Sequence, residues 1–171
     1  MKHATVRRLG RPALVAALAG GMLLTGLAPT AVAESAGGKL GPFGYGGLTL
    51  GMSAKKAQAT GKIVRKPFQG PCAAWDLKAH PTGRDGVGLY ISKRRGVALI
   101  FAPRGVRTPQ GIGVGSTKAQ LKRAYPRLKQ SASGYPVAAV PGNPKASYYF
   151  LLSGSKVSQV GLALNDQDCT N

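Results

Sequence analysis

The sequence predicts an α+β domain in which two strand–helix–hairpin repeats form one antiparallel sheet with two helices packed on one face. The pattern Gly-aliphatic-x-aliphatic-Gly-x-Ser/Thr occurs at residues 47–53 and returns at 111–117. Each copy leads into a run of helix-forming residues. Each is later followed by two apolar segments joined by a short polar turn, the spacing of a β-hairpin. A pattern that returns at this distance indicates a repeated structural unit.

Each copy of the motif predicts a short strand, a tight turn and a capped helix. Gly51 and Gly115 permit the positive φ that a side chain would resist. Ser53 and Thr117 follow them and offer hydroxyls to the free amides of a first helical turn, so we predict that they are helix N-caps. Pro126 disfavours helical geometry in the residue before it, so the second helix is expected to end or kink there.

The remaining elements follow in the same order in both halves. The expected strands and hairpins are 62–66, 72–77, the hairpin 88–92 with 97–101, a proline-interrupted segment at 135–144, and the hairpin 147–152 with 157–164. The boundaries that follow are repeat one at 47–102, a link at 103–110 and repeat two at 111–171. Because the link is short, we expect the two repeats to share one core.

The first 33 residues have the features of a secretory signal peptide. Basic residues and no acid precede a short apolar stretch at 12–27, and Ala31-Val32-Ala33 matches a small-x-small cleavage site. A retained membrane anchor is the alternative, although glycines interrupt the apolar stretch. We expect a secreted protein, extracellular or cell-wall associated, exported by the general secretory or the twin-arginine route, with no transmembrane anchor after processing. The Gly-rich residues 34–46 are then a flexible N-terminal arm.

The charge balance points to anionic partners. The chain has 24 Lys and Arg against 5 Asp and Glu; without the signal peptide, 20 basic and 5 acidic residues leave a net charge of +15. Such a charge attracts polyanions and acidic proteins without choosing among them. The candidate anion-binding residues are Lys93, Arg94 and Arg95 at an expected hairpin tip, with Arg104 and Arg107 on the link. A solvated basic face that serves only solubility is the alternative.

Two cysteines, Cys72 and Cys169, follow the signal peptide. An even number of cysteines in an exported chain predicts a disulfide, here joining the first half to the last residues. In the chain-entropy model a loop of this length stabilises the fold by about 4–5 kcal/mol. A reactive thiol or a metal ligand is the alternative.

The sequence offers little for catalysis. His80 could join Asp76 or Asp85 and a serine in a triad, yet no Gly-x-Ser-x-Gly elbow is present. The run 165–168 alternates like the start of a calcium loop but lacks its glycine and distal glutamate. Zinc-ligand sets, nucleotide-binding loops and nucleic-acid motifs are also missing. We therefore expect a non-enzymatic protein without cofactor or metal, and keep a small hydrolase that uses His80 as the alternative.

Aromatic residues are candidates for a protein interface. We select Tyr90, Tyr148 and Tyr149. Because side chains alternate along a strand, one side of the run 148–150 should be core and the other exposed. Trp75 lies three residues from Cys72 and is expected to pack on the disulfide.

The motif resembles that of a known group of secreted proteins. Leu50-Gly51-Met52-Ser53 followed by Ala57 is similar to the Gly-Met-Thr/Ser signature that opens each repeat of the β-lactamase-inhibitory proteins, and of SmpA/OmlA-type envelope lipoproteins. Gly115-Ser116-Thr117, Leu121 and Ala124-Tyr125-Pro126 resemble a class of uncharacterised secreted actinobacterial proteins. The resemblance implies a tandem αβ repeat whose relatives mostly bind other proteins. The inhibitory proteins place their disulfides within each repeat, whereas here Cys72 would pair with Cys169 across repeats.

Two functions are therefore expected. The first is a secreted, non-enzymatic binding protein that contacts an extracellular protein through the sheet face or loops. The alternative is a basic envelope-associated protein that binds anionic cell-wall polymers or other polyanions. The two differ in salt dependence, because attraction to a polyanion weakens steeply as salt is added.

Overall fold

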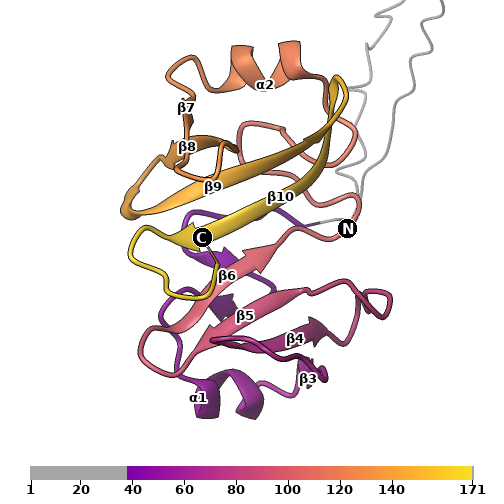
Figure 1. Ribbon diagram of the computed structural model, residues 1–171, viewed down its shortest axis with the longest axis vertical. Helices are drawn as coiled ribbons and strands as arrows, with labels where there is room; N and C mark the ends of the chain where they lie inside the picture. Colours follow the sequence, from indigo (N-terminus) through magenta and orange to yellow (C-terminus); the bar gives the residue numbers. More distant parts are fainter. Residues whose placement is uncertain (1–37, 171) are drawn as a thin grey trace, which may run out of the picture. The chain divides into compact units, whose positions relative to one another are not determined.

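The computed structural model describes residues 38–170 (Figure 1). Its strands are β1 Gly44–Tyr45, β2 Leu48–Thr49, β3 Ile63–Arg65, β4 Ala73–Leu77, β5 Leu89–Ser92, β6 Gly96–Phe101, β7 Lys129–Gln130, β8 Pro136–Val140, β9 Asn143–Ser153 and β10 Lys156–Leu164. Its helices are α1 Ala54–Ala59 and α2 Lys118–Ala124. The predicted signal peptide, residues 1–33, lies outside the described residues, as do residues 34–37 of the expected arm.

Eight strands form one antiparallel sheet in the order β3-β4-β5-β6-β10-β9-β8-β7, and β1 pairs with β2 in a separate small sheet. The protein is therefore mostly β, and the predicted α+β class with a helical layer is wrong. The two halves of the sheet meet where β6 pairs with β10. Among the described residues, no helix is long and apolar enough to cross a membrane.

The helices are too short to form a layer. α1 has six residues and α2 has seven, and each buries a single side chain, Ala57 and Leu121 respectively. Tyr125 leaves helical geometry at φ −130°, as expected for the residue before Pro126. In Figure 1 the two helices lie at opposite ends of the sheet. Segments outside helices and strands contribute Leu40, Val106 and Ile112 to the core in their place.

The main core lies on one face of the sheet and crosses both halves. Cross-strand pairing from β4 to β8 places one row of buried side chains side by side: Trp75, Leu89, Ile100, Leu162, Tyr148 and Ala138. Burying such large side chains is the main source of stability in a domain of this size. Because side chains alternate along each strand, the neighbours of these residues point to the opposite face.

The segment before β2 packs on this core. Leu40 and Leu48 are fully buried, and the Leu40 amide donates to the Arg107 carbonyl at 2.9 Å. Residues 38–46 are thus not the flexible arm that the sequence suggested. Tyr148 is also fully buried, and its hydroxyl donates to the Leu40 carbonyl at 2.9 Å. Burial raises the pKa of Tyr148. Its selection as an interface residue is therefore wrong.

The two copies of the sequence motif make the same pair of backbone hydrogen bonds. In the first half the Gly51 amide donates to the Val97 carbonyl at 2.9 Å, and the Val97 amide donates to the Met52 carbonyl at 2.8 Å. In the second half the turn 115–116 makes both bonds with Val157, each at 2.8 Å. These bonds attach each motif turn to the first residues of β6 or β10, the two strands that meet at the centre of the sheet.

The N-cap predictions are found in the structure. The Ser53 hydroxyl accepts from the Lys56 amide at 3.4 Å. The Thr117 hydroxyl accepts from the Gln120 amide at 3.1 Å, while the Gln120 side chain accepts from the Thr117 amide at 2.8 Å. This capping box satisfies two amides at the start of α2, which lacks the length to be stable by itself.

Replacing Gly96 with alanine tests the attachment of the motif turn to β6. Gly96 has φ +68°, and an added Cβ would lie 2.5 Å from the Met52 carbonyl oxygen, which cannot move without breaking the turn. Gly96→Ala should therefore lower the free energy of unfolding by at least about 3 kcal/mol in urea denaturation.

Gly154, in the corresponding turn between β9 and β10, is the control. It also has positive φ, at +59°, but an added Cβ there would meet open space. Gly154→Ala should lower the free energy of unfolding by about 1 kcal/mol, which is the strain of positive φ alone. Equal losses for the two variants would show that the close approach at Gly96 does not matter.

Candidate functional site

The candidate site is the face of the sheet opposite the core, called here the open sheet face. Pairing from β4 to β8 places one row of side chains on it: Ala74, Tyr90, Leu99, Ala163, Ser147 and Ala139. A second row consists of Phe101, Gly161, Tyr149, Val137 and Lys129. Neither helix places its buried side chain here, since Ala57 and Leu121 belong to the core on the other face.

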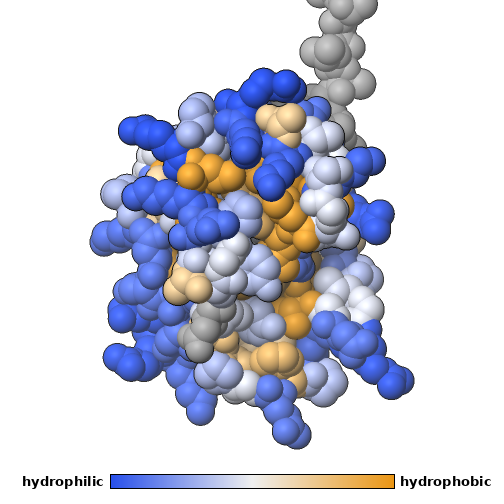
Figure 2. Space-filling view, turned by 45° about the horizontal axis from the view of Figure 1, so that its top comes forward, coloured by the Kyte–Doolittle hydropathy of each residue, from blue (hydrophilic) through white to orange (hydrophobic). Residues whose placement is uncertain are grey.

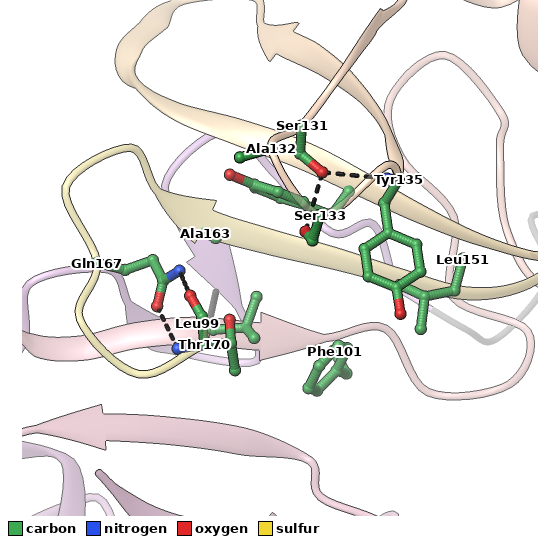
Figure 3. Close-up of a pocket in the computed structure, with 11 residues that line it drawn as sticks. Leu99, Phe101, Ser131, Ala132, Ser133, Tyr135, Leu151, Ala163, Gln167 and Thr170 are labelled. Atoms are coloured by element: carbon green, nitrogen blue, oxygen red, sulfur yellow. Dashed lines mark hydrogen bonds between the residues drawn. The ribbon is translucent and has the colours of Figure 1, made fainter. Parts of the chain in front are cut away.

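A cavity of about 320 Å³ lies in the middle of this face (Figure 3). Its floor is mostly apolar and includes Leu99, Phe101 and Leu151. Gly161 keeps the floor open, because an added Cβ would lie 3.1 Å from Leu99 Cδ1 and 3.3 Å from Phe101 Cε1. Figure 2 shows, on the face that it draws, hydrophobic surface bordered by hydrophilic side chains. The floor of the cavity is itself mostly apolar.

One wall of the cavity is the C-terminal segment, which includes Gln167 and Thr170. The Gln167 side chain accepts from the Thr170 amide at 2.9 Å and donates to the Thr170 carbonyl. The disulfide between Cys72 and Cys169 ties this segment to the residue before β4, with a Cα–Cα distance of 5.2 Å. The predicted disulfide is thus confirmed, and it is compatible with an oxidising compartment outside the cytoplasm.

The disulfide lies on the open sheet face, while Trp75 does not. Cys72 and Cys169 cover the fully buried Ala98, with Tyr90 packed beside them. Trp75 is three residues from Cys72, and because side chains alternate along a strand it points to the opposite face. There it belongs to the core, and its side chain is 6 % exposed. The expectation that Trp75 packs on the disulfide is therefore wrong.

The opposite wall is the loop 131–135 between β7 and β8. Its backbone is closed by hydrogen bonds from the Ser131 amide to the Tyr135 carbonyl at 2.8 Å, and from the Tyr135 amide to the Ser131 hydroxyl at 3.1 Å. The Tyr135 side chain is 42 % exposed, and Figure 3 shows it extended toward Leu151. The loop thus holds a large aromatic ring beside the cavity.

An exposed aromatic stands on the corresponding loop of the first half. Phe68, between β3 and β4, is 47 % exposed and packs against Tyr90 with ring centroids 5.5 Å apart. Tyr90 and Tyr149, which the sequence predicted as interface residues, are half-buried on this face, whereas Phe68 and Tyr135 were not predicted. The available signal was a large aromatic residue within a Gly-, Pro- or Ser-rich loop between two expected strands.

The five basic candidates do not form one site. Arg95 pairs with Asp166 at 2.8 Å. The Arg107 guanidinium donates within its own loop, to the Gly111 carbonyl at 2.9 Å and to the Ser116 hydroxyl at 3.3 Å. Arg107 therefore serves the structure of the link, where it was predicted to bind an anion.

The other three, Lys93, Arg94 and Arg104, are exposed. β6 separates the first two from Arg104 by about 20 Å, at about 3.3 Å per residue. Only the tip of the β5–β6 hairpin therefore keeps the predicted grouping of basic side chains.

Basic residues outnumber acidic ones around the open sheet face, where Asp166 and Asp168 lie on the C-terminal wall and Asp166 pairs with Arg95. Residues 86–165 contain 12 Lys and Arg and no Asp or Glu. Lys129 and Lys145 are exposed at positions that place them on this face by strand alternation. Ligands with negative charge around an apolar centre are therefore favoured.

His80 is not brought to a catalytic carboxylate among the described residues. Its Nε2 lies 3.3 Å from the Tyr45 hydroxyl. Asp76, one of its possible partners, instead accepts hydrogen bonds from Thr82 and Gly88. One group of metal-ligand types, Cys72, Asp168 and Cys169, gathers within 4.8 Å, but the two sulfurs are bonded to each other and are not free thiolates.

Comparisons with known proteins leave the function open. The chain matches neither a family model nor a curated protein. Its structure is similar to the crystal structure of the uncharacterized protein yfeY from Escherichia coli. The two share 18 % sequence identity over 73 % of this chain and 99 % of that chain, with a TM-score of 0.45. The function must therefore be argued from the site itself.

A buried ion pair holds the loop beside β4. Asp76 accepts from the Thr82 hydroxyl at 2.6 Å and from the Thr82 amide at 2.9 Å, and Lys66 Nζ lies 3.3 Å from its Oδ2. Lys66 also donates to the carbonyls of Gly83 and Gly86, each at 2.6 Å. Burial alone would raise the pKa of Asp76, but these hydrogen bonds and Lys66 outweigh it and lower the pKa.

Replacing Asp76 with asparagine should lower the free energy of unfolding at pH 7 by about 2–4 kcal/mol, because it leaves the Lys66 charge buried without its partner. The folded pKa of Asp76 is below the unfolded value of about 3.9. The stability that the Asp76 carboxylate contributes is therefore fully present above about pH 5, and it is lost as the pH falls through the folded pKa. Urea denaturation between pH 2 and pH 7 measures both effects.

Asp85→Asn is the matched control, because Asp85 lies in the same loop but is exposed. The free energy of unfolding of this variant should differ from that of the wild type by no more than about 0.5 kcal/mol. A loss for Asp76→Asn no larger than that of the control, or one that does not shrink in acid, would contradict the assigned role of the ion pair.

Proposed function

We propose that this is a secreted, non-enzymatic binding protein that holds an extracellular protein on its open sheet face. The observation that carries the proposal is the apolar floor of the cavity on that face, left open between the C-terminal segment and the loop 131–135, which presents the exposed ring of Tyr135. A second exposed ring, Phe68, packs on Tyr90 elsewhere on the same face. Contiguous apolar surface with a polar border marks interaction sites on soluble proteins.

The composition of the face fits a protein interface. Tyr149 and the exposed Tyr135 line the cavity. On the same face, Tyr90 is half-buried beside the disulfide and packs against the exposed Phe68. Tyrosine and other aromatic residues supply much of the binding energy when a partner covers them, because they bury a large area with few rotatable bonds. The border carries lysines, as interface rims commonly carry charge.

The face is also formed without a partner. Its floor consists of central strands of the sheet, and the disulfide fixes the C-terminal wall. A preformed surface loses little conformational entropy on binding, so more of the contact energy appears as affinity. The partner that fits is an extracellular protein with an apolar protrusion surrounded by acidic residues. Its contact should withstand salt, because the centre is apolar.

Removing both edge aromatics tests this proposal. The purified protein is immobilised and exposed to the proteins secreted by its own source, and a retained protein is purified and titrated by calorimetry. Phe68→Ser with Tyr135→Ser should weaken its binding at least about tenfold, the loss expected for interface anchors. The wild-type complex should survive 1 M salt and show a negative heat-capacity change.

Phe43→Ser is the control for a general loss of surface apolarity. Phe43 is 57 % exposed but belongs to the segment that covers the core face. The proposal fails if no secreted protein binds saturably, or if the Phe43 variant loses as much affinity as the double variant. A hydrolytic activity of the purified protein that disappears in His80→Ala would favour the small-hydrolase alternative.

A further inference from the structure

We propose that a second surface binds a chain of phosphate groups, such as a phosphodiester polymer. The surface is the α2 groove, a hollow of about 830 Å³ between α2 and the β7–β8 loop. Its rim is formed by the lysines Lys118, Lys122 and Lys129. Its floor is formed by the apolar side chains of Leu128, Pro136 and Leu152. The groove adjoins the open sheet face, with whose cavity it shares Tyr135, but Lys118 and Lys122 lie outside that cavity. The proposal goes beyond the protein partner and does not depend on it.

The three lysines have no counterion within the described chain. Its two ion pairs are those of Lys66 with Asp76 and of Arg95 with Asp166, and neither touches the groove. All three lysines are exposed. Lys118 and Lys122 are four residues apart on α2, an arrangement in which like charges repel and weaken a helix. A bound anion would relieve this repulsion.

The fold does not require these charges. The other copy of the motif has Ala54 and Gln58 at the positions that correspond to Lys118 and Lys122, and α1 forms there with its own N-cap. The capping of α2 uses Thr117 and its backbone, not the lysines. Lys118 and Lys122 are thus a property of the second copy alone.

The groove suits a chain of phosphates better than a carboxylate-rich protein. The planar fork of arginine matches carboxylates and phosphates alike, whereas lysine acts as a compact charge that needs no fixed orientation and can follow successive phosphates of a flexible strand. Arg123, in the last turn of α2, and Arg127, just after the helix, do not line the groove. Lys118 and Lys122 are separated by about 6 Å along the helix axis, so they can contact neighbouring phosphates of one strand. The apolar floor then receives the carbon atoms between the phosphates.

Exchanging residues between the two motif copies provides the test. Lys118→Ala with Lys122→Gln gives α2 the residues of α1. The matched control, Lys55→Ala with Lys56→Gln, gives α1 the residues that α2 has at 119 and 120. Both pairs remove two positive charges from exposed helical positions. Neither changes a residue that lines the cavity of the open sheet face.

Binding is measured by fluorescence anisotropy with two labelled probes of equal charge, a single-stranded phosphodiester oligomer and polyglutamate, from 50 mM to 500 mM NaCl. The α2 variant should raise the Kd for the phosphodiester probe at least about tenfold at the lowest salt, and lower the slope of log K against log salt by about 0.7 for each lysine removed. The α1 variant should change the Kd less than about twofold, as expected for charges outside the site.

Equal losses in the two variants would overturn the proposal, because they would show attraction by net charge alone. Equal or tighter binding of polyglutamate would also overturn it and favour an acidic protein as the occupant. Urea denaturation of both variants confirms that they fold. Binding of the secreted protein partner should be unchanged in the α2 variant, so failure here and failure of the proposed function are distinguishable.

Discussion

The antiparallel pairing of β6 with β10 is the interaction on which the rest of the structure depends. It places Leu99, Ile100 and Phe101 beside Ala163, Leu162 and Gly161. The Ala102 amide continues the ladder by donating to the Val160 carbonyl at 2.8 Å. Because alternate residues face opposite sides, this one pairing joins the core row on one face and the apolar floor on the other. Without it each half would be a four-stranded sheet with an exposed edge.

The disulfide and the motif turns act through the same pair of strands. The chain leaving β10 crosses the end of β6 and is fixed beside β4, so the disulfide ties together strands from both halves. The motif turns bond to Val97 and Val157, the first apolar residues of β6 and β10. Local geometry at the two motifs therefore supports the central pairing and, with it, the open sheet face where we propose that a partner binds.

Local features of the fold could be predicted from the sequence, whereas long-range ones could not. The caps at Ser53 and Thr117 and the two hairpins depend on neighbouring residues. The fold class failed because the two helices form where they were expected but have only six and seven residues, and each buries one side chain, too little to cover a face of the sheet. The assignment of Tyr148 to an interface failed because alternation reveals that two faces differ, but not which one is buried. The hydrogen bonds that the Arg107 side chain donates to Gly111 and Ser116 could not be predicted, because they depend on the conformation of a loop, and residues far apart in the sequence determine that conformation.

Native-state hydrogen exchange tests most directly whether the two halves form one sheet through β6 and β10. The account predicts that amides of these two strands are the most protected and exchange with one common free energy, equal to that of global unfolding. The exposed loops that carry Phe68 and Tyr135 should exchange much faster. Separate free energies for the strands of the first and second halves, with β6 and β10 less protected than their neighbours, would contradict the account.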